Sequence, residues 1–336
     1  MRLRLPSGTI ALTGAVALGC AGEESSPSSR TAPAVAVESF TVTPDSVRLW
    51  YTMIGDGPQV VIVPNALYHG NRLDTLAGPS RRLVLYDPRG RGRSDSVPAE
   101  RVSLDHLVED FDAIRRAAGA DSVAIIGWSG SGMEAFVYAL RHPGRVTRLI
   151  QLAPVAPRWV PWADSLGSSR SMRTDSVAWS QLQARVQAGA FAGDPAAHCR
   201  EQARVSNPAS FGDTALARLA PDVCIYRNEW PTAIGAFFGA LMTSLSGFDW
   251  RDDLARVTIP RLVIHGERDN TPLAGNCEWV VGQSTARLLV IRGAGHWPHY
   301  ERPAETIEAM RAFLDGGWPA GSHAATAAAG ASECAP

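Results

Sequence analysis

The residues with the clearest chemical potential lie around Ser129, in the hexapeptide 127–132 (GWSGSG). An apolar, β-branched run at 122–126 (SVAII) precedes the hexapeptide, and a stretch compatible with a helix follows it. This order of strand, small-residue turn and helix is typical of a nucleophilic serine. The sharp turn holds the serine hydroxyl where it can attack a substrate. Gly127 and Ser131, two positions before and after the serine, are small enough for the strand and helix to approach closely. The pattern predicts Ser129 as the nucleophile of covalent catalysis.

A serine nucleophile needs a base, and the base needs a group that orients it. The stretch 260–269 predicts a buried strand that delivers Asp269 into the following loop. A second strand, predicted at 286–291, is followed by a short loop that ends in His296. We therefore predict that His296 accepts the proton of Ser129 and that Asp269 fixes the imidazole tautomer. The chain order Ser, Asp, His is one of the few in which such triads occur.

The elements that must position these residues alternate along the chain. Apolar runs predict strands at 47–54, 60–63, 82–86 and 146–152, and helical apolar spacing predicts helices at 104–117 and 131–141. This alternation predicts an α/β fold, a mostly parallel sheet with helices on both faces. In such sheets ligands bind beyond the carboxyl ends of the strands, where all three predicted catalytic residues fall.

Further motifs make the chain resemble a known family. The segments 87–94 (DPRGRGRS), 142–146 (HPGRV), 293–296 (GAGH) and 301–303 (ERP) resemble conserved turns of the α/β-hydrolase superfamily. From about residue 46 to 315 the chain looks like a serine hydrolase of the esterase and proline-iminopeptidase branch. The resemblance implies a core at 38–155 and 249–315, and a helical lid inserted at 156–248. We expect residues 316–336, which are rich in Gly, Ala and Ser, to form a disordered tail.

The resemblance also implies an oxyanion hole made of two backbone amides. One donor is expected to be the Gly130 amide, at the start of the helix after the nucleophile. Relatives carry His-Gly in the loop that supplies the second donor, but this chain has Pro-Asn-Ala-Leu at 64–67. Asn65 tolerates the left-handed turn that this loop needs. The second donor is then expected to be the amide of Ala66 or of Leu67.

The expected reaction is cleavage of a carboxylic ester or amide of a small, fairly apolar substrate through an acyl-enzyme. Trp128 is expected to border the acyl pocket, and Glu229 and Trp230 of the inserted segment are further candidates for substrate contact. One alternative is an aminopeptidase of the proline-iminopeptidase type, in which Glu229 binds the substrate's amino group. Another is a catalytically impaired binding lipoprotein on the same scaffold. Dehalogenase and epoxide-hydrolase chemistry is disfavoured, because those enzymes use an Asp where this chain has Ser129.

Four other features carry expectations of their own. The cysteines after Cys20 allow three pairings, of which we favour Cys199 with Cys224 because both fall in the inserted segment. Cys277 is expected to be a buried thiol. His299 is expected at the surface or against the lid, and the arginines within 89–93 are expected to form a solvated turn.

The N-terminus resembles a bacterial lipoprotein signal. Arg2 and Arg4 precede an apolar segment at 10–18 that is too short to span a bilayer, and Gly19-Cys20 follows. Cys20 is the expected lipidation site, which makes 1–20 the signal and 21–37 a flexible linker. Ala17 departs from the Leu that the pattern favours, so an ordinary cleaved signal of a soluble periplasmic or secreted protein is the alternative. In both cases the protein is exported, and in the first a lipid anchor attaches it to the membrane.

The composition bounds the remaining possibilities. The chain has 336 residues, of which 45% are hydrophobic and 19% charged, enough for one large domain or for one domain with an insertion. A formal net charge of −1 gives no electrostatic basis for binding nucleic acid. The sequence contains no lysine, which removes Lys as a base or Schiff-base former. No CxxC or HxxxH spacing occurs, so we expect neither a metal site nor a cofactor.

Overall fold

A single eight-stranded sheet carries the candidate residues. The computed structural model describes residues 37–162, 169, 172–325 and 334, all within one compact unit. Cys20, the predicted signal and all but the last residue of the predicted linker lie outside the described residues. The strand order is β1-β2-β4-β3-β5-β6-β7-β8. The strands are β1 (Val37–Val42), β2 (Arg48–Ile54), β3 (Gln59–Pro64), β4 (Arg81–Tyr86), β5 (Val123–Trp128), β6 (Val146–Leu152), β7 (Arg261–Gly266) and β8 (Ala286–Ile291).

In the strand order, all pairs from β4 to β8 are parallel, and β2 runs antiparallel to both of its neighbours, β1 and β4. The prediction of a mostly parallel sheet is thereby confirmed. Strand β1 was not expected, because it begins inside the stretch assigned to the linker. Parallel pairing places the carboxyl ends of β3, β5, β7 and β8 at one edge, so the loops after them share one side of the molecule.

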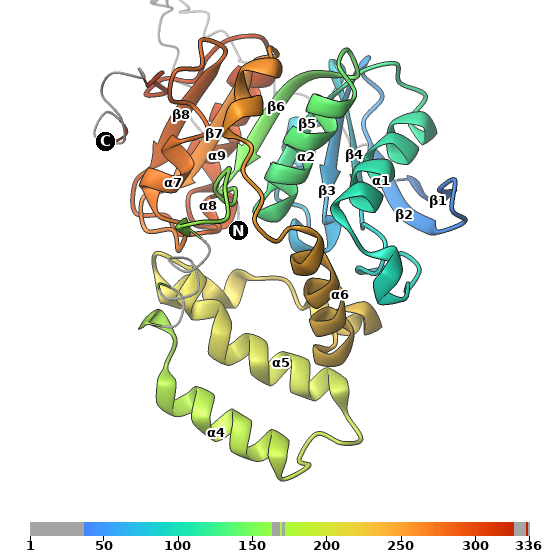
Figure 1. The fold of residues 1–336 in the computed structure, drawn as a ribbon, viewed down its shortest axis with the longest axis vertical. Coiled ribbons are helices and arrows are strands. Elements are labelled where there is room, and N and C mark those ends of the chain that lie inside the picture. The colour runs from blue at the N-terminus through green and yellow to red at the C-terminus, as the bar shows by residue number, and fades with distance from the viewer. Residues whose placement is uncertain (1–36, 163–168, 170–171, 326–333, 335–336) are drawn as a thin grey trace, which may run out of the picture. The chain divides into compact units, whose positions relative to one another are not determined.

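Helices cover both faces of the sheet, as the alternation predicted (Figure 1). The helices are α1 (Leu104–Ala117), α2 (Gly130–Arg141), α4 (Ser176–Gln187), α5 (Pro195–Ser206), α6 (Pro231–Ser244), α7 (Leu273–Cys277), α8 (Pro298–Glu301) and α9 (Pro303–Leu314). Within β5, Val123 and Ile125 join the core with α1 and α2, whereas Ala124 and Ile126 join the core with α9. This two-residue alternation buries β5 on both sides, as expected for an internal strand.

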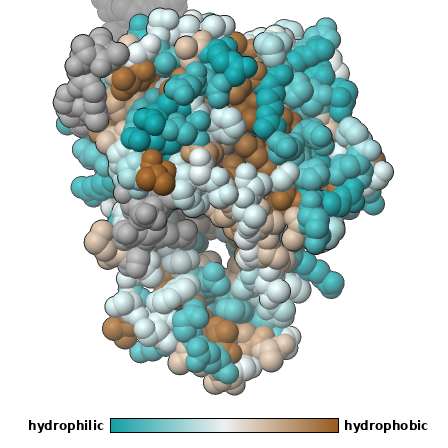
Figure 2. Space-filling model, in the orientation of Figure 1, coloured by the Kyte–Doolittle hydropathy of each residue, from teal (hydrophilic) through white to brown (hydrophobic). Residues whose placement is uncertain are grey.

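The segment 156–248, between β6 and β7, forms a mostly helical insertion. Figure 1 shows α4 and α5 together beyond one end of the sheet, with α6 nearer to it. Cys199 on α5 forms a disulfide with Cys224 of the same insertion, as favoured from the sequence. Figure 2 shows an opening between these helices and the part of the molecule that holds the sheet.

The C-terminal stretch differs from expectation. His323 exchanges two backbone hydrogen bonds with Leu288 of β8, and Ala325 accepts one from Gly282. Cys277 forms a disulfide with Cys334 and is therefore not a free thiol. The prediction of a disordered tail is wrong for residues 316–325, because polar backbone next to β8 gains hydrogen bonds there. None of the helices in the described residues is long and apolar enough to cross a membrane.

Candidate active site

Ser129 lies on a strained turn between β5 and α2. Its φ of 57° and ψ of −126° belong to a region that non-glycine residues rarely adopt. A side chain at Gly127 would run into the backbone of Ser131 and Gly132, so the turn requires glycine there. Ser131 fits the position that often holds glycine, because its Oγ donates a 2.7 Å hydrogen bond to the Trp128 carbonyl. The residues 127–132 therefore build the sharp turn that the sequence predicted.

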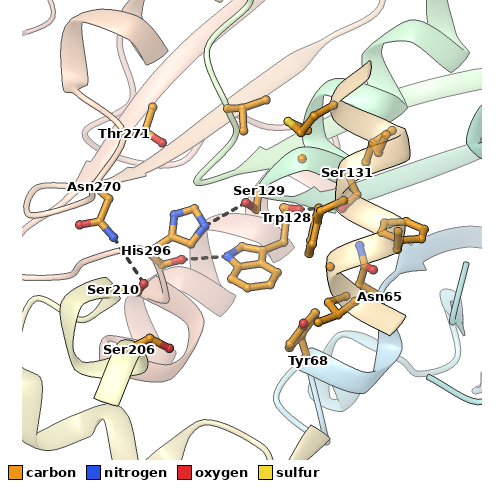
Figure 3. Close-up of a pocket in the computed structure, with 18 of the residues that line it drawn as sticks. Asn65, Tyr68, Trp128, Ser129, Ser131, Ser206, Ser210, Asn270, Thr271 and His296 are labelled. Carbon is orange, nitrogen blue, oxygen red and sulfur yellow. Dashed lines mark hydrogen bonds between the residues drawn. The ribbon is translucent and has the colours of Figure 1, made fainter. Parts of the chain in front are cut away.

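The structure brings the three predicted catalytic residues together at the carboxyl edge of the sheet. His296 Nε2 lies 2.9 Å from Ser129 Oγ (Figure 3). His296 Nδ1 lies 2.9 Å from Asp269 Oδ1. The Asp269 carboxylate is fully buried and also accepts the Thr271 amide. Burial raises the pKa of Asp269, but the charge and hydrogen bond of His296 outweigh it, so the net pKa is lowered. Asp269 is therefore ionised and can orient an imidazole that gains a proton.

The loop that carries His296 is held by residues from three elements. The His296 amide donates to the Ser210 carbonyl of the inserted segment at 2.8 Å. The Trp128 indole donates to the His296 carbonyl at 2.8 Å, as Figure 3 shows. The buried Glu301 carboxylate accepts the Gly295 amide and the Gly212 amide, each at 2.7 Å. The inserted segment thus contacts the loop of the candidate base directly.

Two amides remain as candidate oxyanion donors. The Gly130 amide stands at the N-terminus of α2 and has no acceptor among the described residues. Asn65 adopts the expected left-handed conformation, with φ 60° and ψ 46°. The Leu67 amide donates to Asp87 Oδ1 at 2.9 Å, so this amide is occupied and the expectation for Leu67 is wrong. The Ala66 amide has no acceptor within the described part of the chain, which leaves Ala66 as the second candidate.

Ser129 and His296 open onto a cavity of about 1140 Å³. This volume exceeds the range of about 300–1000 Å³ that is usual for drug-sized ligands. Much of the lining is apolar and comes from the end of β5, from α2 and from the insertion: Trp128, Met133, Trp159, Trp162, Trp179, Phe237, Phe238, Leu241 and Met242. Trp128 borders the cavity as expected. Trp230 is not among the lining residues, because its indole donates to the Cys224 carbonyl within the insertion.

Glu229 reaches the cavity wall already paired with a cation. Its carboxylate forms a two-pronged ion pair with Arg91, with Nε–Oε1 at 2.9 Å and Nη2–Oε2 at 2.8 Å. The Gly92 amide and the Tyr68 hydroxyl donate to the same carboxylate. With these four hydrogen bonds made inside the protein, Glu229 is not a free carboxylate that awaits a ligand.

Sequence reasoning missed several buried polar residues near this site. Arg89 is fully buried between Asp45 and Asp110, and Arg91 is buried against Glu229, so the expectation of a solvated arginine turn is wrong. Asp110 could have indicated from the sequence that an arginine is buried here. It interrupts the apolar face of α1, and a buried acid requires a partner.

His299 was expected at the surface or against the lid, and the first of these positions is wrong, because His299 is fully buried. Its Nε2 lies 3.3 Å from Nδ1 of the equally buried His69, whose Nε2 lies 3.2 Å from the Pro64 carbonyl. Because a carbonyl only accepts, His69 Nε2 carries the proton, and His299 donates to His69 Nδ1. No group of three or more potential ligands in the described residues is arranged to hold a metal ion.

Comparisons with known proteins agree with this architecture. A proline iminopeptidase from Pestalotiopsis fici is 25% identical over 286 residues, which cover 81% of this chain and 97% of the relative. A pimeloyl-[acyl-carrier protein] methyl ester esterase from Nitrosomonas europaea is 27% identical over 264 residues, which cover 77% of this chain and 96% of the relative. The solved structure of an esterase from Exiguobacterium antarcticum matches with a TM-score of 0.62 and 19% identity, covering 83% of this chain and all of that one. The family model of the alpha/beta hydrolase fold matches residues 66–303, so the chain belongs to this family.

Proposed function

We propose that the protein is a serine hydrolase that cleaves a carboxylic ester of an apolar substrate through an acyl-enzyme. The observation that supports it best is the hydrogen-bonded series Ser129, His296, Asp269, with Ser129 on a strained turn that opens onto the cavity. The strained turn costs folding free energy of about 1–3 kcal/mol, which is typical of a backbone held for function. An intact series of this kind speaks against an impaired binding protein.

In the proposed mechanism Ser129 Oγ attacks the ester carbonyl carbon while His296 Nε2 accepts the hydroxyl proton. Asp269 holds His296 in the tautomer with hydrogen on Nδ1 and stabilises the imidazolium. The amides of Gly130 and Ala66 bind the developing oxyanion, and loss of one such donor elsewhere costs about 3–4 kcal/mol. The intermediate collapses, His296 protonates the leaving alcohol, and water activated by His296 then releases the acid.

Glu229 bears on the choice between ester and aminopeptidase substrates. A buried substrate ammonium requires a carboxylate to pair with it. Because Glu229 is committed to Arg91, an ammonium at this position would have to displace an internal cation. The aminopeptidase alternative, in the form that relies on Glu229, is therefore the weaker proposal, although one relative is named a proline iminopeptidase.

Two further proposals concern the setting of this activity. We propose that the segment 156–248 acts as a lid, since it supplies much of the cavity wall. Its Ser210 carbonyl accepts the His296 amide, and its Gly212 amide donates to the Glu301 carboxylate that holds the His296 loop. We also propose that the protein is exported and attached to a membrane by a lipid on Cys20, on the strength of the N-terminal sequence alone.

A fluorophosphonate probe tests the proposed nucleophile. The probe should label Ser129, located by peptide mass spectrometry, and Ser129→Ala should abolish labelling and hydrolysis of p-nitrophenyl esters. Ser246→Ala, which removes an exposed hydroxyl of the insertion, serves as the matched control and should retain both. Labelling at Ser131, with Ser129→Ala still active, would overturn the assignment. A series of p-nitrophenyl esters of increasing acyl length then measures how much of the cavity the acyl group uses.

A further inference from the structure

The described part of the cavity wall contains one ionisable side chain without a partner. Among the described residues that line the cavity, Arg91 pairs with Glu229, and Arg158 pairs with Glu278. Glu134 lines the same cavity but accepts no hydrogen bond and forms no ion pair within the described part of the chain. Its exposed fraction is only 6%, so it is an unpaired carboxyl group in a largely dehydrated position.

Glu134 lies close to the proposed nucleophile. It is on α2, one helical turn after Gly130, and helical side chains lean back toward the N-terminus of their helix. The position that a Cβ atom would take on Gly130 is 3.7 Å from Glu134 Oε1. The carboxyl group therefore reaches back to the residue whose amide is the first candidate oxyanion donor.

The surroundings of Glu134 compensate its negative charge only in part. The pKa of Glu134 is raised to about 7, mainly by burial. The positive charge of Arg91 acts against this increase, and the negative charge of Asp110 adds to it. Tyr86, whose own pKa is raised by burial and by both acids, adds no positive charge. Arg91 is already neutralised by Glu229. A buried carboxylate without a partner is unfavourable, and a negative charge here also repels the oxyanion of the transition state.

One kind of substrate group would remove both the cost of the buried charge and its repulsion of the oxyanion. A cationic group on the acyl part of the substrate would pair with Glu134 and cancel its charge beside the oxyanion. We propose that Glu134 recognises a protonated amine on the acyl chain of the substrate, so that the cavity accepts apolar acyl groups with one ammonium. This inference rests on the proposed function and assigns its substrate class through a residue on α2, in place of Glu229.

Matched ester pairs test the proposal. Methyl esters of glycine, 3-aminopropanoic, 4-aminobutanoic and 5-aminopentanoic acid are compared with those of propanoic, butanoic, pentanoic and hexanoic acid. Each pair exchanges an ammonium for a methyl group of similar size. At pH 7 the wild type should prefer the ammonium ester in kcat/KM by about tenfold or more for at least one chain length. Glu134→Gln should bring that ratio close to one, and Glu109→Gln, an exposed charge change on α1, should not.

The pH dependence of kcat/KM provides a second test, because a purely structural role of Glu134 would not change it. For the methyl esters without an amine, kcat/KM of the wild type relative to Glu134→Gln should fall as pH rises through 7, because Glu134 then ionises beside the oxyanion. A preference for the ammonium ester that survives Glu134→Gln, or its absence at every chain length, would overturn the proposal.

Failure of the proposed function would look different. If no ester is hydrolysed by the wild type, the esterase proposal fails, and calorimetry still tests Glu134 by comparing the binding of pentylammonium with that of pentan-1-ol. Tighter binding of pentylammonium that is lost in Glu134→Gln supports the site, and equal binding of the two probes refutes it. Melting temperatures of both variants show whether a lost signal reflects unfolding.

Discussion

Glu229 of the inserted segment and Arg91 of the turn after β4 form a buried, two-pronged ion pair across 138 residues of sequence. Their side-chain exposed fractions are 1% and 5%. The pair joins the insertion to the sheet beside the cavity. Desolvation of two charges offsets much of their attraction, but loss of one partner leaves the other buried and uncompensated.

Removal of the acid should therefore destabilise the protein strongly. Glu229→Ala leaves the Arg91 guanidinium buried without its carboxylate, and we expect the free energy of unfolding to fall by about 3–5 kcal/mol. Urea denaturation of the wild type, Glu229→Ala and Arg91→Met/Glu229→Leu measures this. The double variant should lose less than Glu229→Ala. A loss under about 1 kcal/mol in the single variant would contradict a buried pair.

The Glu301 carboxylate should matter for turnover more than for substrate affinity. Glu301→Gln replaces one of the two oxygens that accept the Gly295 and Gly212 amides with a donor, which displaces the His296 loop. We expect kcat to fall by about ten- to a hundredfold with little change in KM, since small misplacements of a catalytic group have effects of this size. Glu308→Gln on the exposed side of α9 is the control. An unchanged kcat with a raised KM would refute this role.

The buried histidine pair should make the fold sensitive to acid. Burial lowers the pKa of His69 to about 4 and lowers that of His299 as well. Below pH 6.5 the unfolded chain binds protons that the folded protein excludes, so stability falls with falling pH until the folded pKa is reached. His69 alone should contribute a loss of about 3 kcal/mol between pH 6.5 and 4.

Urea denaturation at pH 7, 5.5 and 4.5 checks this dependence. The free energy of unfolding of the wild type should decrease more steeply with falling pH than that of His69→Gln, which has no titrating imidazole at this position. Parallel pH profiles for the two proteins would show that the buried imidazole of His69 is not responsible.

Lipid attachment rests on the sequence around Cys20. In cells that express the full chain, radiolabelled palmitate should be incorporated into the wild type but not into Cys20→Ala, and only the wild type should fractionate with membranes. An N-terminus of the mature protein at a residue other than Cys20, with no label, would favour an ordinary cleaved signal.

The sequence by itself determined the parts of the protein that depend on local pattern. Apolar runs predicted β2 through β8, and helical spacing predicted α1 with the bounds that the structure has. The order of Ser129, Asp269 and His296, each on the segment that follows a strand, was enough to predict that they meet. In a parallel sheet the loops after the strands meet at one edge, so position along the chain fixes position in space.

Only the tertiary structure decided the roles that depend on contacts between distant segments. Nothing local to Glu229 shows that Arg91 neutralises it, and nothing local to Leu67 shows that Asp87 occupies its amide. The burial of His299 and the pairing of Cys277 with Cys334 likewise depend on segments that lie apart in sequence. Charge and hydrogen-bonding capacity are properties of a residue, but whether they are satisfied depends on its neighbours in the fold. For that reason Glu134, the one unpaired acid of the described cavity wall, was not evident from the sequence.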